Sequence, residues 1–164
     1  MDYLWSPWRY QYIANIKQPR DCVFCIGVSM EQDEEKFILF RGEHNFVILN
    51  IFPYTTGHLL ISPYEHVSDF SECSPRQLSE MMDLAGQSKL ALERSYHPDG
   101  FNLGMNLGKC AGAGVEHHLH FHVVPRWIGD ANFISIVGES RVLPETLDVT
   151  FQKLKGAFRL TPQV

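Results

Sequence analysis

The sequence has no excess of basic residues and no long apolar run. Its 164 residues include 14 Lys and Arg against 19 Asp and Glu, which gives a formal charge of -5 at pH 7. Broad binding to nucleic acid or to an anionic membrane needs many basic side chains that contact phosphates, so we expect neither as a partner. No run approaches the roughly 18 apolar residues of a membrane-spanning helix. This charge is compatible with a small anion held at one local site.

The sequence also lacks the pattern of a secretion signal. Its first residues, MDYLWSPWRYQYI, do not contain a basic segment followed by a continuous apolar stretch. We therefore expect a cytoplasmic protein whose four cysteines are reduced thiols or metal ligands. The composition, with 45% hydrophobic and 20% charged residues, is typical of a globular domain.

We expect a single domain over residues 1–164, without repeats or low-complexity tracts. Residues 1–21 form an arm rich in Trp and Tyr, 22–128 a core, and 129–164 a C-terminal extension. Exposed aromatic side chains are costly in water, so the arm is expected to pack on the domain or on a second subunit.

Short runs of branched and aromatic residues, separated by turn signals, predict antiparallel strands. These runs cover residues 36–41, 45–50, 58–62, 101–107 and 118–124. A long helix is predicted after Ser74, which can form a capping box with Gln77 while Pro75 takes the first helical position. It ends before the turn signal at 97–100. With a second amphipathic helix at 144–158, the pattern predicts an α+β fold with helices packed on an antiparallel sheet.

Four of the eight histidines lie within residues 117–122. Side chains alternate along a strand, so His118, His120 and His122 share one face. Three imidazoles are unsuited to an apolar core, because each needs a hydrogen-bond partner once it leaves water. Two kinds of chemistry fit. The histidines could share a catalytic Zn²⁺ that also binds water, or one could be a nucleophile whose neighbours fix its tautomer.

The segment before these histidines is rich in glycine. Residues 104–114, GMNLGKCAGAG, contain four glycines. Glycine lets backbone N–H groups converge on an anion, and phosphate is the usual ligand of such loops. A flexible connection between two strands is the alternative interpretation. The glycine spacing matches neither the P-loop nor the dinucleotide-binding pattern.

The histidine segment resembles the signature of the histidine triad (HIT) superfamily. The sequence HLHFHVV at 118–124 matches His-φ-His-φ-His-φ-φ, where φ is apolar. Further segments are similar to the diadenosine tetraphosphate phosphorylase-like branch: WSPWR at 5–9, PYTTGH at 53–58, PRW at 125–127, and the stretch 132–145. The resemblance implies a HIT-like α+β fold, usually a homodimer, that binds nucleotides and transfers or hydrolyses nucleotidyl groups without an organic cofactor.

The resemblance also implies roles for the triad. His120 would attack the α-phosphorus of a nucleoside or dinucleoside polyphosphate, and water or inorganic phosphate would then release the nucleotide. His122 would contact phosphate oxygens or the leaving group, and His118 completes the triad. A nucleotide-binding or scaffold protein with secondary catalytic activity is the alternative from another class.

Further nucleotide contacts follow from matching positions. Asn106 corresponds to a phosphate-site asparagine, and Asn50 stands where many relatives carry a ribose-binding aspartate. Gly114 stands where several branches have Gln or Ser. The expected nucleotide-binding residues are Asn50, Asn106, Gly112, Gly114, Val115, His122 and Trp127.

Cys22 and Cys25 form a Cys-x-x-Cys pair, which alone is ambiguous between zinc binding, redox chemistry and chance. Some families that the chain resembles hold a structural zinc with such a pair and two histidines, here His66 and His118. Two thiolates and two imidazoles make a closed tetrahedral site, which is structural. His58 and His44 are spare candidates, although His58 is expected to shape its turn.

Overall fold

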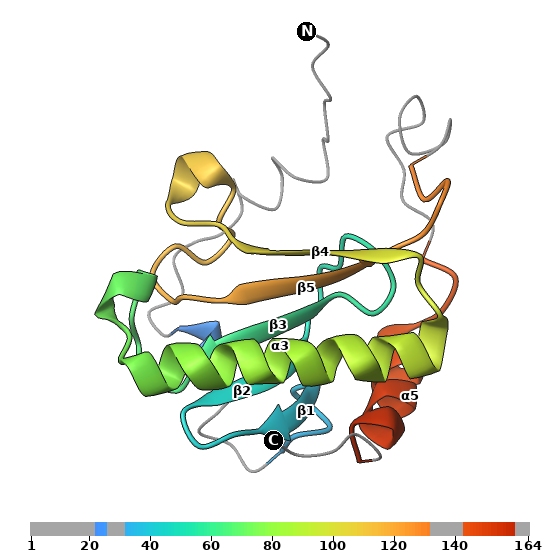
Figure 1. Cartoon of the computed structure of the whole chain (residues 1–164), viewed down its shortest axis with the longest axis horizontal. Helices are drawn as coiled ribbons and strands as arrows, with labels where there is room; N and C mark the ends of the chain where they lie inside the picture. The colour runs from blue at the N-terminus through green and yellow to red at the C-terminus, as the bar shows by residue number, and fades with distance from the viewer. Residues whose placement is uncertain (1–21, 26–31, 132–142, 160–164) are drawn as a thin grey trace, which may run out of the picture.

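The computed structural model describes residues 22–25, 32–131 and 143–159. Within these ranges, a five-stranded antiparallel sheet of order β1-β2-β3-β5-β4 is covered by two α-helices (Figure 1). The elements are β1 (Ile38–Arg41), β2 (Asn45–Leu49), β3 (Leu59–Pro63), η1 (Phe70–Glu72), α3 (Pro75–Tyr96), β4 (Gly100–Met105), η2 (Lys109–Ala111), β5 (Phe121–Arg126) and α5 (Leu147–Arg159). The predicted α+β class is confirmed. The aromatic arm at 1–21 and the segment 132–142 lie outside the described residues.

Helix α3 begins as its sequence predicts. The Ser74 side chain accepts a hydrogen bond from the Gln77 N–H, and the Gln77 side chain accepts one from the Ser74 N–H. Pro75 occupies the first helical position, where no N–H is needed. The helix ends at His97, which adopts the left-handed conformation. No helix in the described ranges is both long and apolar enough to cross a membrane.

The two faces of the sheet pack against different partners. One face forms the main core with α3 and α5, and contributes side chains such as Val47, Leu59 and Val123. Alternation places Phe46 and Leu60 on the opposite face, where they pack with Phe24 and Ile38. This second cluster matters for the site, because Leu60 pairs directly with His122 across β3 and β5. The histidines therefore lie on the face opposite α3.

The strand that carries the histidines is shorter than predicted. The sequence predicts a strand over 118–124, but β5 begins at Phe121. Before it, the Leu119 N–H donates to the Val67 carbonyl oxygen and the Leu119 carbonyl accepts from the Ser62 hydroxyl. These bonds fix the segment without a regular ladder. The predicted alternation still holds, because Leu119, Phe121 and Val123 are buried in the main core.

Other boundaries also differ from the prediction by a few residues. Strand β4 ends at Met105, so Asn106 begins the connection to η2. Helix α5 begins at Leu147 and not at residue 144. Glu145 instead accepts hydrogen bonds from Tyr96 and Thr150, which ties this segment to the end of α3 and to the first turn of α5.

Candidate active site and metal site

The three aligned histidines are buried but each has a hydrogen-bond partner. Their exposed fractions are 1% for His118, 7% for His120 and 9% for His122. His118 Nε2 lies 2.9 Å from the Pro63 carbonyl oxygen, His120 Nδ1 lies 2.9 Å from the His118 carbonyl oxygen, and His122 Nδ1 lies 2.8 Å from His58 Nε2. Each ring therefore has the hydrogen-bond partner that its burial requires, and the three histidines form part of a buried polar network.

The partner of His120 determines where its proton lies. A carbonyl oxygen can only accept, so His120 Nδ1 carries the hydrogen and donates to His118. In the neutral ring the lone pair is then on Nε2. Burial lowers the pKa of both His118 and His120, which favours neutral rings. His120 therefore has the tautomer that a nucleophilic Nε2 requires, and the residue retains a small exposed fraction.

Phe24, which lies between the two cysteines in the sequence, packs on this part of the triad. Its ring centroid lies 5.2 Å from that of His118 and 5.2 Å from that of His120. Phe24 is 5% exposed and belongs to the second hydrophobic cluster. The short helical turn at 23–25 therefore links the candidate metal ligands Cys22 and Cys25 to the ring of His120.

We expect Phe24→Ala to destabilise the fold by about 3 kcal/mol, because it removes a buried aromatic ring. Phe24→Leu keeps most of the apolar contact and should cost about 1 kcal/mol. Val23→Ala is the matched control, since Val23 lies in the same turn but is 51% exposed. Urea unfolding of the three variants measures the difference. Equal midpoints for Phe24→Ala and Val23→Ala would show that the Phe24 contact contributes nothing.

His122 lies between two further polar side chains. His58 Nε2 contacts its Nδ1, and Asn106 Nδ2 lies 3.4 Å from its Nε2. The ring of Tyr54 is stacked on His122, with centroids 5.8 Å apart and planes at 13°. The structure thus brings Asn106 to the triad, where the sequence predicts a phosphate contact.

The glycine-rich segment uses some of its backbone donors locally. Gly112 ends η2 in the left-handed conformation at φ 88°, and its N–H donates to the Lys109 carbonyl oxygen. This N–H is engaged in the turn, which weakens its predicted role as a phosphate donor. Val115 packs against the second cluster. The expected backbone donors at Gly114 and Val115 stay predictions.

Two residues predicted to contact the nucleotide, Asn50 and Trp127, form hydrogen bonds within the protein. Asn50 accepts a hydrogen bond from the Phe52 N–H, and its amide nitrogen lies 3.3 Å from His58 Nδ1. Asn50 thereby stabilises a turn and contacts His58, whose ring in turn contacts His122. Trp127 follows the last residue of β5, and its indole N–H donates to the Tyr96 carbonyl at the end of α3. The ribose contact of Asn50 and the nucleotide contact of Trp127 stay predictions.

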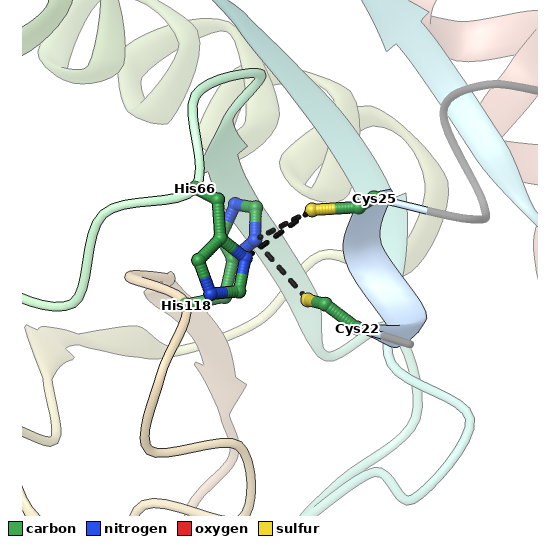
Figure 2. Close-up of side chains that lie close together, drawn as sticks. All are labelled: Cys22, Cys25, His66 and His118. Carbon is green, nitrogen blue, oxygen red and sulfur yellow. Dashed lines mark hydrogen bonds between the residues drawn. The ribbon is translucent and has the colours of Figure 1, made fainter. Parts of the chain in front are cut away.

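The four predicted metal ligands meet in space. Cys22 and Cys25 lie on one turn and point toward His66 and His118, which come from separate segments (Figure 2). Cys22 Sγ lies 3.2 Å from His118 Nδ1, and Cys25 Sγ lies 3.3 Å from His66 Nδ1. The four donor atoms all lie within 4.8 Å of one another. Neighbouring S and N ligands of tetrahedral zinc are separated by about 3.6 Å, which these spacings approach.

The hydrogen bonding around these residues fits a metal ion. His118 donates its Nε2–H to the Pro63 carbonyl, which leaves the Nδ1 lone pair directed at the thiols. Burial, and then the neighbouring Cys22, raise the pKa of the Cys25 thiol, so a nearby cation would favour its thiolate form. Zinc at this site would fix the turn at 23–25 against the histidine segment.

The same geometry disfavours a catalytic zinc held by the three histidines. The Nδ1 atom of His118 faces the cysteines, whereas His120 Nδ1 faces a carbonyl oxygen. The Nδ1 lone pair of His118 therefore points to the cysteines, while His120 Nδ1 carries a hydrogen and has no lone pair to offer. These two nitrogen atoms do not bind the same metal ion.

Sequence reasoning missed two residues of the site. His58 was expected to shape its turn, and it does so by accepting a hydrogen bond from the Tyr54 N–H, but its second contact, with His122, was not foreseen. A signal was present, since His58 has the same parity as Leu60, the residue that pairs with His122. Phe24 had no sequence signal beyond its place between the two cysteines.

Comparison with known proteins gives consistent matches. The HIT domain family model matches residues 31–127. A Mycobacterium tuberculosis protein named AP-4-A phosphorylase is 38% identical over 166 aligned residues, covering 97% of this chain and 85% of the relative. A Zn-bound histidine triad family protein from Mycobacterium smegmatis has a TM-score of 0.70 at 31% identity, covering 85% of this chain and 94% of that one. With the triad and the fold in agreement, this chain belongs to the HIT domain family.

Proposed function

We propose that the protein is a nucleotidyl hydrolase or transferase that cleaves dinucleoside polyphosphates, such as diadenosine tetraphosphate, through a nucleotidyl-histidine intermediate. The observation that carries this proposal is the bond from His120 Nδ1–H to the His118 carbonyl, because it leaves the Nε2 lone pair as the nucleophile. The name of the mycobacterial relative, AP-4-A phosphorylase, supports the substrate class.

The first step is attack of His120 Nε2 on the α-phosphorus. A nitrogen–phosphorus bond forms, the bond from that phosphorus to the bridging oxygen breaks, and the departing nucleoside triphosphate keeps the electron pair. The ring of His122 lies beside that of His120, and Asn106 lies beside His122; both side chains can contact the phosphate oxygens on which charge develops. The protein contributes mainly position and charge stabilisation.

The second step releases the nucleotide. An oxygen of water or of inorganic phosphate attacks the same phosphorus and expels the neutral imidazole. Water yields a nucleoside monophosphate and loses a proton to solvent, whereas phosphate yields a nucleoside diphosphate. The two acceptors define a hydrolase and a phosphorylase, respectively.

The cysteine–histidine cluster complements this mechanism without entering it. We propose that Cys22, Cys25, His66 and His118 hold a structural zinc, a role supported by their geometry and by the zinc in the mycobacterial neighbour. Through His118, this site would fix the carbonyl that orients His120. A cytoplasmic location and a homodimer stay predictions from the sequence.

Product analysis with diadenosine tetraphosphate tests the proposed function. With inorganic phosphate present, a phosphorylase forms ADP and ATP, and a hydrolase forms AMP and ATP under both conditions. We expect ATP as one product in either case, because the attack occurs at the α-phosphorus. Two molecules of ADP formed without phosphate would contradict that position of attack. Tight nucleotide binding without any turnover would favour the scaffold alternative.

A further inference from the structure

The loop between β4 and β5 is anchored at both ends on the face of the sheet that carries the histidines. At its start, Asn106 Nδ2 lies 3.4 Å from His122 Nε2. Toward its other end, Ala113 is buried and Val115 packs against the second hydrophobic cluster. The ring centroids of His122 and His120 are 5.0 Å apart. The loop therefore runs beside the row of histidines, with η2 beyond the end of β4 (Figure 1).

The exposed part of this loop is η2, which begins at Lys109. Lys109 follows Asn106 by three residues, so their Cα atoms are at most about 11 Å apart. Gly108 lies between them at φ 76°, a conformation that residues with a Cβ rarely adopt, so the turn before Lys109 depends on glycine. The Lys109 ammonium is carried on a long flexible stem, which lets it reach a phosphate bound beside Asn106.

The charge of Lys109 is not neutralised by a partner within the described ranges. Several other basic side chains there pair with a carboxylate: Arg41, Lys89, Arg126, Lys153 and Lys155. Among described residues Lys109 has no ion pair, and Glu116 of the same loop is no exception. The sequence has no other Lys or Arg over 106–122. Because burial lowers the pKa of His118 and His120, Lys109 is the positive charge that this segment offers to a polyanionic substrate.

The two steps of the proposed reaction place a phosphate group in the same position. In phosphoryl transfer the attacking and leaving atoms lie roughly in line, on opposite sides of the phosphorus. In the first step His120 Nε2 attacks from one side, and the rest of the polyphosphate leaves on the other. In the second step the acceptor oxygen enters from that other side, and the electron pair of the nitrogen–phosphorus bond returns to Nε2. One cation on that side therefore serves both the departing polyphosphate and the entering acceptor.

We propose that Lys109 binds the phosphate group in line behind the α-phosphorus, first the terminal phosphates of the substrate and then inorganic phosphate as the acceptor. This role rests on the proposed function and assigns its acceptor, since a cation favours the phosphate dianion and gives no such advantage to neutral water. The expected activity is thus that of a phosphorylase. The name of the mycobacterial relative, AP-4-A phosphorylase, agrees with this assignment.

Calorimetric titration with AMP, ADP and ATP measures the contact without turnover, in the His120→Asn background. We expect ATP to bind about 10-fold more tightly than AMP. Lys109→Gln should remove most of that gain while AMP affinity changes by less than about threefold. Lys109→Arg keeps the charge and should keep the gain. Arg76→Gln is the matched control, because Arg76 is an exposed cation in the first turn of α3, which covers the opposite face of the sheet.

The titrations separate this proposal from the proposed function. Equal affinities for AMP and ATP in the presence of Lys109, or a gain that Lys109→Gln leaves intact, would overturn the role of Lys109 alone. The same loss of gain in Arg76→Gln would assign it to net charge and would also overturn that role. If none of the three nucleotides binds, the proposed function fails and the role of Lys109 fails with it.

Product analysis with diadenosine tetraphosphate and inorganic phosphate supplies the second readout. We expect ADP and ATP from the wild type. Lys109→Gln should raise the KM for phosphate about 10-fold, so that water competes and AMP replaces part of the ADP. Lys109→Arg should restore ADP, and all variants should melt at the wild-type temperature because the side chain is exposed. An unchanged KM for phosphate in Lys109→Gln, or AMP in place of ADP from the wild type, would overturn the acceptor role while leaving nucleotidyl transfer in place.

Discussion

His120→Ala is expected to lower kcat by at least about 10⁴-fold, because no other group replaces a covalent nucleophile. Nucleotide affinity should change by less than about threefold, since the other residues proposed to contact the nucleotide are unchanged. Steady-state assays with diadenosine tetraphosphate and calorimetric titration with a nucleoside monophosphate measure the two quantities. The pair of results separates loss of chemistry from loss of binding.

A second substitution protects this test from a folding defect. In His120→Asn, the side-chain amide can still donate to the His118 carbonyl as Nδ1 does, but it presents no Nε2 lone pair. We expect the same loss of kcat with a smaller change in stability. His117→Asn is the matched control, because His117 is an exposed neighbour with no assigned role. Full activity in either His120 variant would rule out the assigned nucleophile.

Loss of metal is expected to affect stability far more than the chemical step. We expect Cys25→Ser to bind no zinc and to unfold at a temperature about 10 °C lower than the wild type. A ligand present at 1,000-fold over its Kd adds about 4 kcal/mol to the free energy of unfolding. In a chain of this size each 1 kcal/mol of stability shifts Tm by about 2–4 °C, so loss of the metal accounts for a shift of about 10 °C. Metal analysis and thermal unfolding of the purified proteins check both expectations.

Cys110→Ser is the control for the metal site, because Cys110 is an exposed cysteine outside the cluster. Its zinc content and Tm should equal those of the wild type. A chelator added to the wild type should lower Tm while the initial rate at 25 °C changes little, as a closed structural site implies. Immediate loss of activity in a protein that is still folded would instead indicate a catalytic metal.

Much of this site could be predicted from local sequence patterns. Alternation along a strand is enough to place His118, His120 and His122 on one face, and the structure keeps that arrangement. The capping box predicts the start of α3 because both partners lie within one turn of chain. The Cys22 and Cys25 spacing predicts a pair of ligands on one turn, and the histidines were identified by resemblance.

Other features depend on contacts between distant segments, which no local pattern contains. The start of β5 is set by Val67 and Ser62, which satisfy the backbone of Leu119 in place of a ladder. His58 meets His122 across 64 residues of sequence, through the pairing of β3 with β5. The backbone donor of Gly112 is used by its own turn, which depends on its left-handed conformation and not on composition.

Mass spectrometry of the protein quenched during turnover of diadenosine tetraphosphate tests the central claim most directly. We predict an acid-labile adduct of one adenylyl group on the peptide that contains His120, and its absence in His120→Asn. Turnover that proceeds with no adduct on the wild type under rapid quenching, or with an adduct on another residue, would contradict a nucleotidyl-histidine mechanism at His120.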